Sequence, residues 1–162
     1  MLYYLHRYDE AAAELRQALD LDSSNISARA ELGRVLVPQR RFPEALAALP
    51  EAVDLQAGHL GGGSRGYARG MAGHREDAAA MERRLEQRAR ERYIDPEALA
   101  MVAIGLDDTA GALDWLERGR DQRSFYLPFV AADPIYKPLH RNARFLQHVR
   151  TIGLHIPRDS TR

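Results

Sequence analysis

The sequence repeats itself after 34 residues, and this period restricts the possible folds more than any other feature. Six residues of the segment 8–21 have a counterpart of the same kind 34 positions later. The matched pairs are Tyr8 and Phe42, Glu10 and Glu44, Ala11 and Ala45, Leu15 and Leu49, Ala18 and Ala52, and Leu21 and Leu55. A unit of this length is typical of a helix, a turn and a second helix, which cannot bury their apolar stripe without a neighbouring unit. The period therefore predicts a stack of helical hairpins.

Local preferences agree with a helical fold. Alanine, leucine, glutamate and arginine dominate the chain, whereas valine, isoleucine and threonine, which favour strands, are sparse. Asn25 and Asn142 are predicted to cap helices, since each precedes a helical apolar pattern. Pro38 should end its helix near Val37, because proline cannot donate the intrahelical hydrogen bond. We therefore expect an all-α protein.

The repeats resemble those of the tetratricopeptide repeat family. In that family a leucine-glycine pair lies in the first helix of the hairpin, and Leu32 and Gly33 match it. A small residue opens the second helix, at a position matched here by Ala11, Ala45, Ala78 and Ala112. Gly66 stands where the glycine of the third unit is expected. The resemblance implies an α-solenoid, a right-handed superhelix of antiparallel helix hairpins, with a C-terminal capping helix.

The resemblance covers residues 1 to about 119 and implies a single domain over 1–156. The expected units are 1–25, 26–57, 58–92 and 93–119, followed by a cap at 120–156 and a tail at 157–162. In the cap, Phe125, Tyr126 and Phe129 are expected to cover the apolar end of the last hairpin, because an open end exposes a hydrophobic face.

The source and the extent of the parent protein can also be inferred. Most of the first helix of the first unit is missing, so the chain is expected to be the C-terminal portion of a larger protein. Arginine outnumbers lysine by 22 to 1, a bias typical of GC-rich genomes, so that protein is expected to be bacterial.

The hexapeptide 61–66, GGGSRG, matches two catalytic or binding signatures. Its glycines fit the G-x-G-x-x-G pattern of a dinucleotide-binding turn, and Ser64 fits the G-x-S-x-G pattern of a nucleophile elbow. Both patterns need a preceding strand, whereas the preceding segment, EALAALPEAVDLQ, has a helical pattern. We interpret the hexapeptide as part of a packing helix in which Gly66 allows a close helix contact. An enzyme that uses Ser64 is the catalytic alternative.

Composition excludes several classes of function. Acidic and basic residues balance at 23 each, so no net charge favours nucleic acid or an acidic membrane. There is no cysteine, no apolar stretch long enough for a membrane span, and no histidine spacing typical of a metal site. The arginine-rich stretch 81–92 is interpreted as a solvated helix face. We therefore expect a cytoplasmic protein without metal or other cofactors, which binds neither nucleic acid nor membranes.

The resemblance implies a non-enzymatic protein–protein interaction module. Members of the family hold a peptide or partner segment in the concave groove formed by the first helices of the hairpins. The expected groove residues are Tyr3, Tyr4, Ser27, Ala30, Arg34, Tyr67, Met71, Glu97 and Met101. Because Leu2, Tyr4 and Leu5 would be poorly covered, self-association through the N-terminal end, as in a self-assembling structural module, is the second alternative.

Overall fold

A computed structural model describes residues 1–49 and 58–156 and shows an all-helical protein, with no strand among these residues. The repeat matches at Ala52 and Leu55 and the expected tail at 157–162 lie outside the described residues. The helices are α1 (Tyr8–Leu21), α2 (Ile26–Leu36), α3 (Phe42–Ala48), α5 (Gly58–Met71), α6 (Arg75–Ala89), α7 (Pro96–Gly105), α8 (Thr109–Asp121) and α9 (Ala143–Thr151). Two 3₁₀ helices, η1 (Leu127–Phe129) and η2 (Pro134–Leu139), separate α8 from α9.

The predicted helix boundaries are confirmed at three positions. The side chain of Asn25 accepts a hydrogen bond from the backbone N–H of Ala28 and caps α2. Asn142 caps α9 in the same way. The helix that precedes Pro38 ends at Leu36. These residues act within one turn of the helix end, so the sequence is sufficient to predict their effect.

Helices that are close in the sequence pack against each other. α2 contacts α1, α3 and α5, and α7 contacts α5, α6 and α8. Glycines bring α5 and α7 together: a Cβ atom on Gly66 would overlap the side chain of Val102, and one on Gly70 would overlap the backbone of Gly105. The predicted close helix contact at Gly66 is confirmed.

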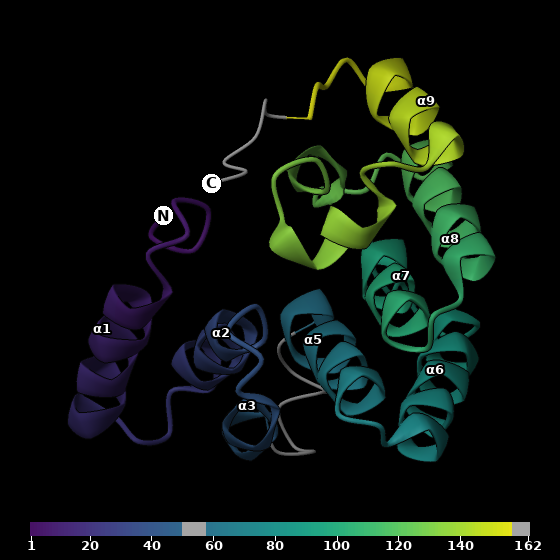
Figure 1. Ribbon diagram of the computed structural model, residues 1–162. Coiled ribbons are helices and arrows are strands. Elements are labelled where there is room, and N and C mark those ends of the chain that lie inside the picture. Colours follow the sequence, from purple (N-terminus) through teal and green to yellow (C-terminus); the bar gives the residue numbers. More distant parts are fainter. Residues whose placement is uncertain (50–57, 157–162) are drawn as a thin grey trace.

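Residues 124–139, here called the C-terminal segment, turn back from α8 into the molecule. Figure 1 shows the helices following one another along an arc, with η1 and η2, drawn in green, on its inner side. Four large apolar side chains of the segment are fully buried there, namely Val130, Ile135, Tyr136 and Leu139. They share one hydrophobic core with α2, α5 and α7.

The prediction that Phe125, Tyr126 and Phe129 cover the apolar end of the last hairpin is wrong in part. Phe125 is 74% exposed and Phe129 is 40% exposed. The covering side chains belong instead to Leu127 and to the residues from Val130 onward. The turn at Arg123, whose φ is +53°, redirects the chain after α8 and changes which side chains face inward.

Candidate functional site

A buried ion pair joins α2 to the C-terminal segment. Nη2 of Arg34 lies 2.8 Å from Oδ2 of Asp133, and the hydroxyl of Tyr3 donates to Oδ1 of the same carboxylate at 2.7 Å. Nη2 of Arg34 also donates to the hydroxyl of Tyr4 at 2.7 Å. The guanidinium carbon lies 3.8 Å above the centre of the Tyr3 ring, so a cation–π contact completes the group.

The surroundings of this ion pair favour its charged state. Arg34 is 5% exposed and Asp133 is 3% exposed, so both are removed from water. Burial alone would lower the pKa of Arg34, but Tyr3, Asp133, Tyr4 and Glu31 together raise it above its usual value. Burial also raises the pKa of Tyr3, and the charge of Asp133 raises it further. Tyr3 therefore stays protonated and remains a hydrogen-bond donor to Asp133.

A second buried carboxylate, that of Glu97 in α7, holds the beginning of the C-terminal segment. Ser124 donates from its hydroxyl to Oε2 of Glu97 at 2.6 Å, and Tyr136 donates to the backbone carbonyl of Glu97 at 3.1 Å. Glu97 is 1% exposed, and its Oε1 atom has no hydrogen-bond partner in the described part of the chain. Burial raises the pKa of Glu97, which the bond from Ser124 only partly offsets.

Four aromatic rings form a connected group, here called the aromatic cluster: Tyr4, Phe125, Tyr126 and Phe129. Phe129 stacks on Tyr4 with ring centres 5.8 Å apart, and Phe125 meets Tyr126 edge-on at 5.1 Å. Phe125 and Phe129 lie 6.4 Å apart. Since the two phenylalanines are exposed, the cluster presents apolar surface to the solvent.

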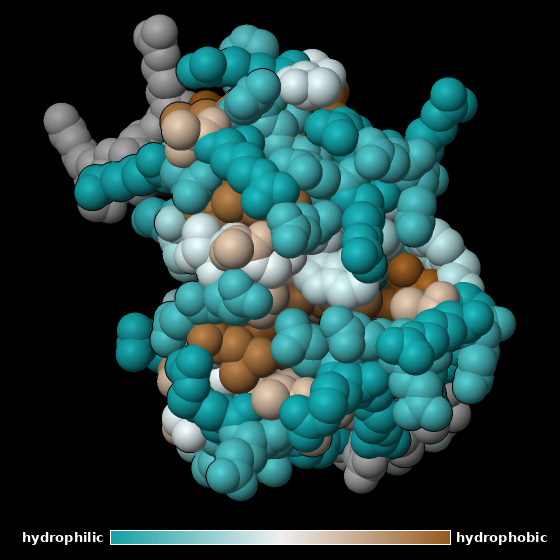
Figure 2. Space-filling view, turned by 90° about the vertical axis from the view of Figure 1, so that its right-hand side faces the viewer, coloured by the Kyte–Doolittle hydropathy of each residue, from teal (hydrophilic) through white to brown (hydrophobic). Residues whose placement is uncertain are grey.

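A pocket of about 630 Å³ lies where the end of α6 meets α7 and α8, and it is here called the arginine pocket. Its lining includes Arg90, Arg92, Tyr93, Leu99, Trp115 and Arg118. Figure 2 shows the side of the molecule that carries α6 and α8: hydrophilic residues cover most of it, and apolar ones reach the surface near its middle. The volume is in the range of sites that hold small ligands or side chains.

The expected groove residues do not form an open groove. Tyr3, Arg34, Tyr67, Glu97 and Met101 are buried, as is Ala30, while Tyr4 and Met71 are half-buried and Ser27 is exposed. The structure brings together Tyr3, Tyr4 and Arg34 around Asp133. Glu97 and Met101 line a small cavity together with Tyr136 and Val130. Ser27 takes no part in either group. Asp133 and Ser124, which hold these residues, carry no signal in the sequence that distinguishes them from turn residues.

Ser64 lies inside helix α5 and is fully buried. Its hydroxyl has no hydrogen-bond partner within residues 1–49 and 58–156, so no base is placed to activate it there. The GGGSRG segment is helical, as predicted, and lacks the strand-to-helix turn that a nucleophile elbow requires.

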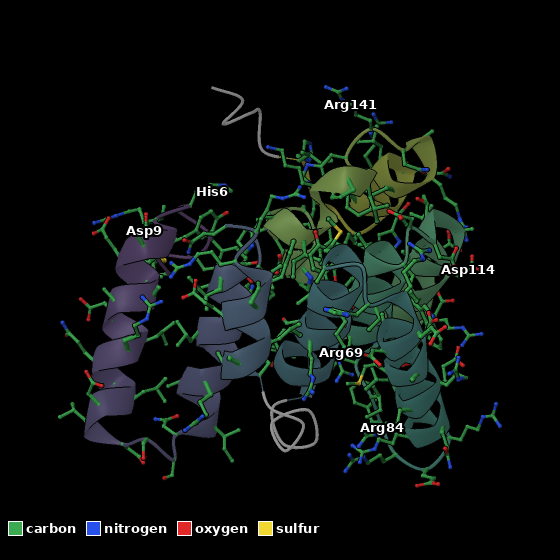
Figure 3. All side chains as sticks on the ribbon, turned by 60° about the horizontal axis from the view of Figure 1, so that its bottom comes forward. His6, Asp9, Arg69, Arg84, Asp114 and Arg141 are labelled. Carbon is green, nitrogen blue, oxygen red and sulfur yellow. The ribbon has the colours of Figure 1, made fainter. Side chains whose placement is uncertain are left out.

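Metal sites and membrane-spanning helices are the two other kinds of functional feature to consider. Within the described ranges, no group of three or more histidine, aspartate or glutamate side chains is placed to hold a metal ion. No helix in that part of the chain is both long and apolar enough to cross a bilayer. Charged side chains such as Arg84, Asp114 and Arg141 point outward from the helices and loops (Figure 3).

No protein-family model, no curated protein and no solved structure matches the chain. The resemblance to tetratricopeptide repeats therefore stays a prediction from the sequence.

Proposed function

We propose that this protein is a protein–protein interaction module whose helical hairpins stack as an α-solenoid of the tetratricopeptide type. The 34-residue period and the matching small residues support the solenoid. The contacts of α2 with α5 and of α5 with α7 agree with stacked hairpins, since they join helices at corresponding places in successive units. A stack of this kind offers extended surfaces to partner segments.

The observation that carries the proposal is the exposure of the aromatic cluster. Phe125 and Phe129 leave apolar ring surface in water, although other aromatic residues of the same segment, such as Tyr136, are fully buried. Clustered aromatic side chains on a surface are typical of the residues that contribute most to binding at interfaces. The aromatic cluster is therefore the place where we expect a partner to bind.

This position differs from the open groove that the family implies. The inner ends of α2 and α7 are covered by Val130, Ile135, Tyr136 and Leu139. Burying each such side chain stabilises the fold by roughly 1.5–3 kcal/mol, so displacing the segment would cost more than most peptides gain on binding. A partner is expected to bind at the rim of the covered face instead.

Affinity purification with two baits tests the proposal. Wild-type protein and the variant Phe125→Ser/Phe129→Ser are incubated with a lysate of the source organism, and the retained proteins are quantified by mass spectrometry. We expect at least one protein that the wild type retains and the variant loses. Leu21→Ser, which changes an exposed leucine at the end of α1, is the matched control and should retain it. Equal retention by all three baits contradicts the proposal.

Self-association is the second candidate function. A pocket of about 420 Å³ lies between the N-terminal turn, α1 and α2, and its lining includes Met1, Leu2 and Leu15. Met1 and Leu5 expose apolar surface at the same end. If copies associate there, the mass measured by sedimentation equilibrium rises with protein concentration, and Leu2→Glu prevents the rise. A constant monomer mass rules this candidate out.

A further inference from the structure

We propose that the arginine pocket binds an acidic peptide segment that inserts one apolar side chain. The inference rests on the proposed function, because it supplies a partner chemistry for a protein-binding module. It concerns a different surface from the aromatic cluster, so the two can fail separately.

The walls of the pocket suit an apolar side chain. Leu99 is fully buried and forms part of the base, while the half-buried ring of Trp115 and the exposed ring of Tyr93 line the sides. Tyr93 is 61% exposed, so the opening keeps aromatic surface in water. Aromatic and aliphatic walls around a concave site are typical of pockets that take an apolar anchor.

The charges around the pocket favour an acidic ligand. Three arginines and a single acidic residue, Glu86, are among its lining residues. Within residues 1–49 and 58–156, no carboxylate forms a salt bridge with Arg90, Arg92 or Arg118. The resulting positive potential attracts carboxylates, and a planar guanidinium can bind one through two hydrogen bonds.

Several arginines at other surfaces of the molecule are paired with carboxylates. Nε of Arg144 lies 2.7 Å from Glu117, and Nη2 of Arg41 lies 2.6 Å from Glu44. Arg118 instead lies over the ring of Trp115, with its guanidinium carbon 4.4 Å from the ring centre. This stacking orients the cation at the wall of the pocket, where it is available to a carboxylate beside the inserted side chain.

A peptide is favoured over nucleic acid for two reasons. The chain has no net charge, so it lacks the extended positive field that binds a phosphate backbone. The pocket also mixes apolar and aromatic side chains with its arginines, in a volume of about 630 Å³. A single-stranded RNA serves as the competing ligand in the test, so that binding of nucleic acid at the pocket would be detected.

Trp115 makes the test specific to the site, because it is the only tryptophan in the sequence and lines the pocket. The probe is a blocked peptide with a Leu-Phe centre and glutamates on both sides, titrated while the emission of Trp115 is recorded. The control peptide keeps the centre and has lysines in place of the glutamates. We expect a saturable change with the acidic peptide alone, which weakens as salt is added because salt screens exposed charges.

Charge reversal locates the binding. The double variant Arg92→Glu/Arg118→Glu should bind the acidic peptide with an affinity roughly tenfold or more below that of the wild type. Arg141→Glu is the matched control: Arg141 is exposed and does not line the pocket, so its change should leave the affinity as it was. Arg92→Glu alone, which leaves the stacked Arg118 in place, serves if the double variant does not fold by circular dichroism.

Two results would overturn the inference. Equal binding of the acidic and lysine peptides would show that charge does not select the ligand. Stronger binding of a single-stranded RNA that displaces the acidic peptide would assign the pocket to a different class of partner. Neither result affects the capture that depends on Phe125, so a failure here leaves the test of the proposed function intact.

Discussion

Two buried carboxylates anchor the C-terminal segment, and their surroundings differ in one respect. Asp133 faces the guanidinium of Arg34 at 2.8 Å and also accepts hydrogen bonds from Tyr3 and from the backbone N–H of Ile135. Glu97 accepts one hydrogen bond from Ser124, and its Oε1 atom has no partner in the part of the chain that the structure describes. One acid is balanced by a cation, whereas the other relies on a neutral donor.

This difference explains how the segment is held. A buried charge is tolerated when an opposite charge and hydrogen bonds replace the water it has lost. Asp133 meets that condition, so it can fasten α2 to the segment as an ion. Among the described residues, Glu97 has no cation beside it and does not meet that condition, and burial raises its pKa. The contact between α7 and the C-terminal segment is therefore most stable when this carboxyl carries a proton.

The largest effect is expected from Asp133→Ala. Removing the carboxylate leaves the buried cation of Arg34 with the more distant Glu31, whose Oε2 atom lies 3.4 Å from Nη1. The loss of one member of a buried ion pair typically costs about 3–5 kcal/mol. The free energy of unfolding, measured by urea denaturation, should fall by that amount. Arg34→Met/Asp133→Leu removes both charges and should recover much of the loss. A single variant as stable as the wild type would show that the ion pair does not hold the segment.

A smaller effect is expected from Ser124→Ala. The change removes the donor to Oε2 of Glu97, and an unsatisfied buried acceptor costs about 1–3 kcal/mol. Since the bond from Ser124 lowers the pKa of Glu97, its loss should raise that pKa further. Urea denaturation at pH 8 should therefore show a larger loss than at pH 4. A loss that does not change between these pH values would mean that Glu97 is not ionised at either of them.

A loss of about 1.5 kcal/mol is expected from Tyr3→Phe, which removes a single hydrogen bond to a charged group. Asp133 keeps Arg34 and Ile135 as partners, so the ion pair survives. Thermal unfolding in parallel with Tyr8→Phe, a half-buried tyrosine at the start of α1, provides the comparison. Equal melting temperatures for the Tyr3 variant and the wild type would remove Tyr3 from the network.

The sequence predicted those parts of the fold that depend on neighbouring residues. The caps at Asn25 and Asn142, the helix end before Pro38 and the close contact at Gly66 all follow from local patterns or from the repeat. Each of these effects acts within a helical turn or at a fixed place in a repeat unit. Such signals are readable without knowing how the helices pack.

The contacts of the C-terminal segment were not predicted, for physical reasons. Arg34 and Asp133 are 99 positions apart, and nothing near either residue indicates its partner. Which side chains of the segment face inward depends on the turn at Arg123 and on two short 3₁₀ helices, so the expected covering role of Phe125 could not be checked from the sequence. The stretch 81–92 does not reveal the pocket that Arg90 and Arg92 line, because α7 and α8 complete this pocket only in the folded chain.

The smallest effect, a gain in stability, is expected from Glu97→Gln. This variant tests most directly whether Glu97 and Asp133 differ in their need for a negative charge. Burial raises the folded pKa of Glu97 above that of the unfolded chain, which is about 4.3, so the native carboxyl ionises at a higher pH than the unfolded one. Ionisation therefore costs native stability as the pH rises through that range, and the amide avoids the cost. The variant should match the wild type at pH 4 and be more stable than the wild type at pH 8, measured by urea denaturation. Asp133→Asn, which weakens an ion pair, should lose stability at pH 8. A Glu97→Gln variant that is less stable than the wild type at pH 8 would mean that the negative charge itself stabilises the fold, and the contrast with Asp133 would be wrong.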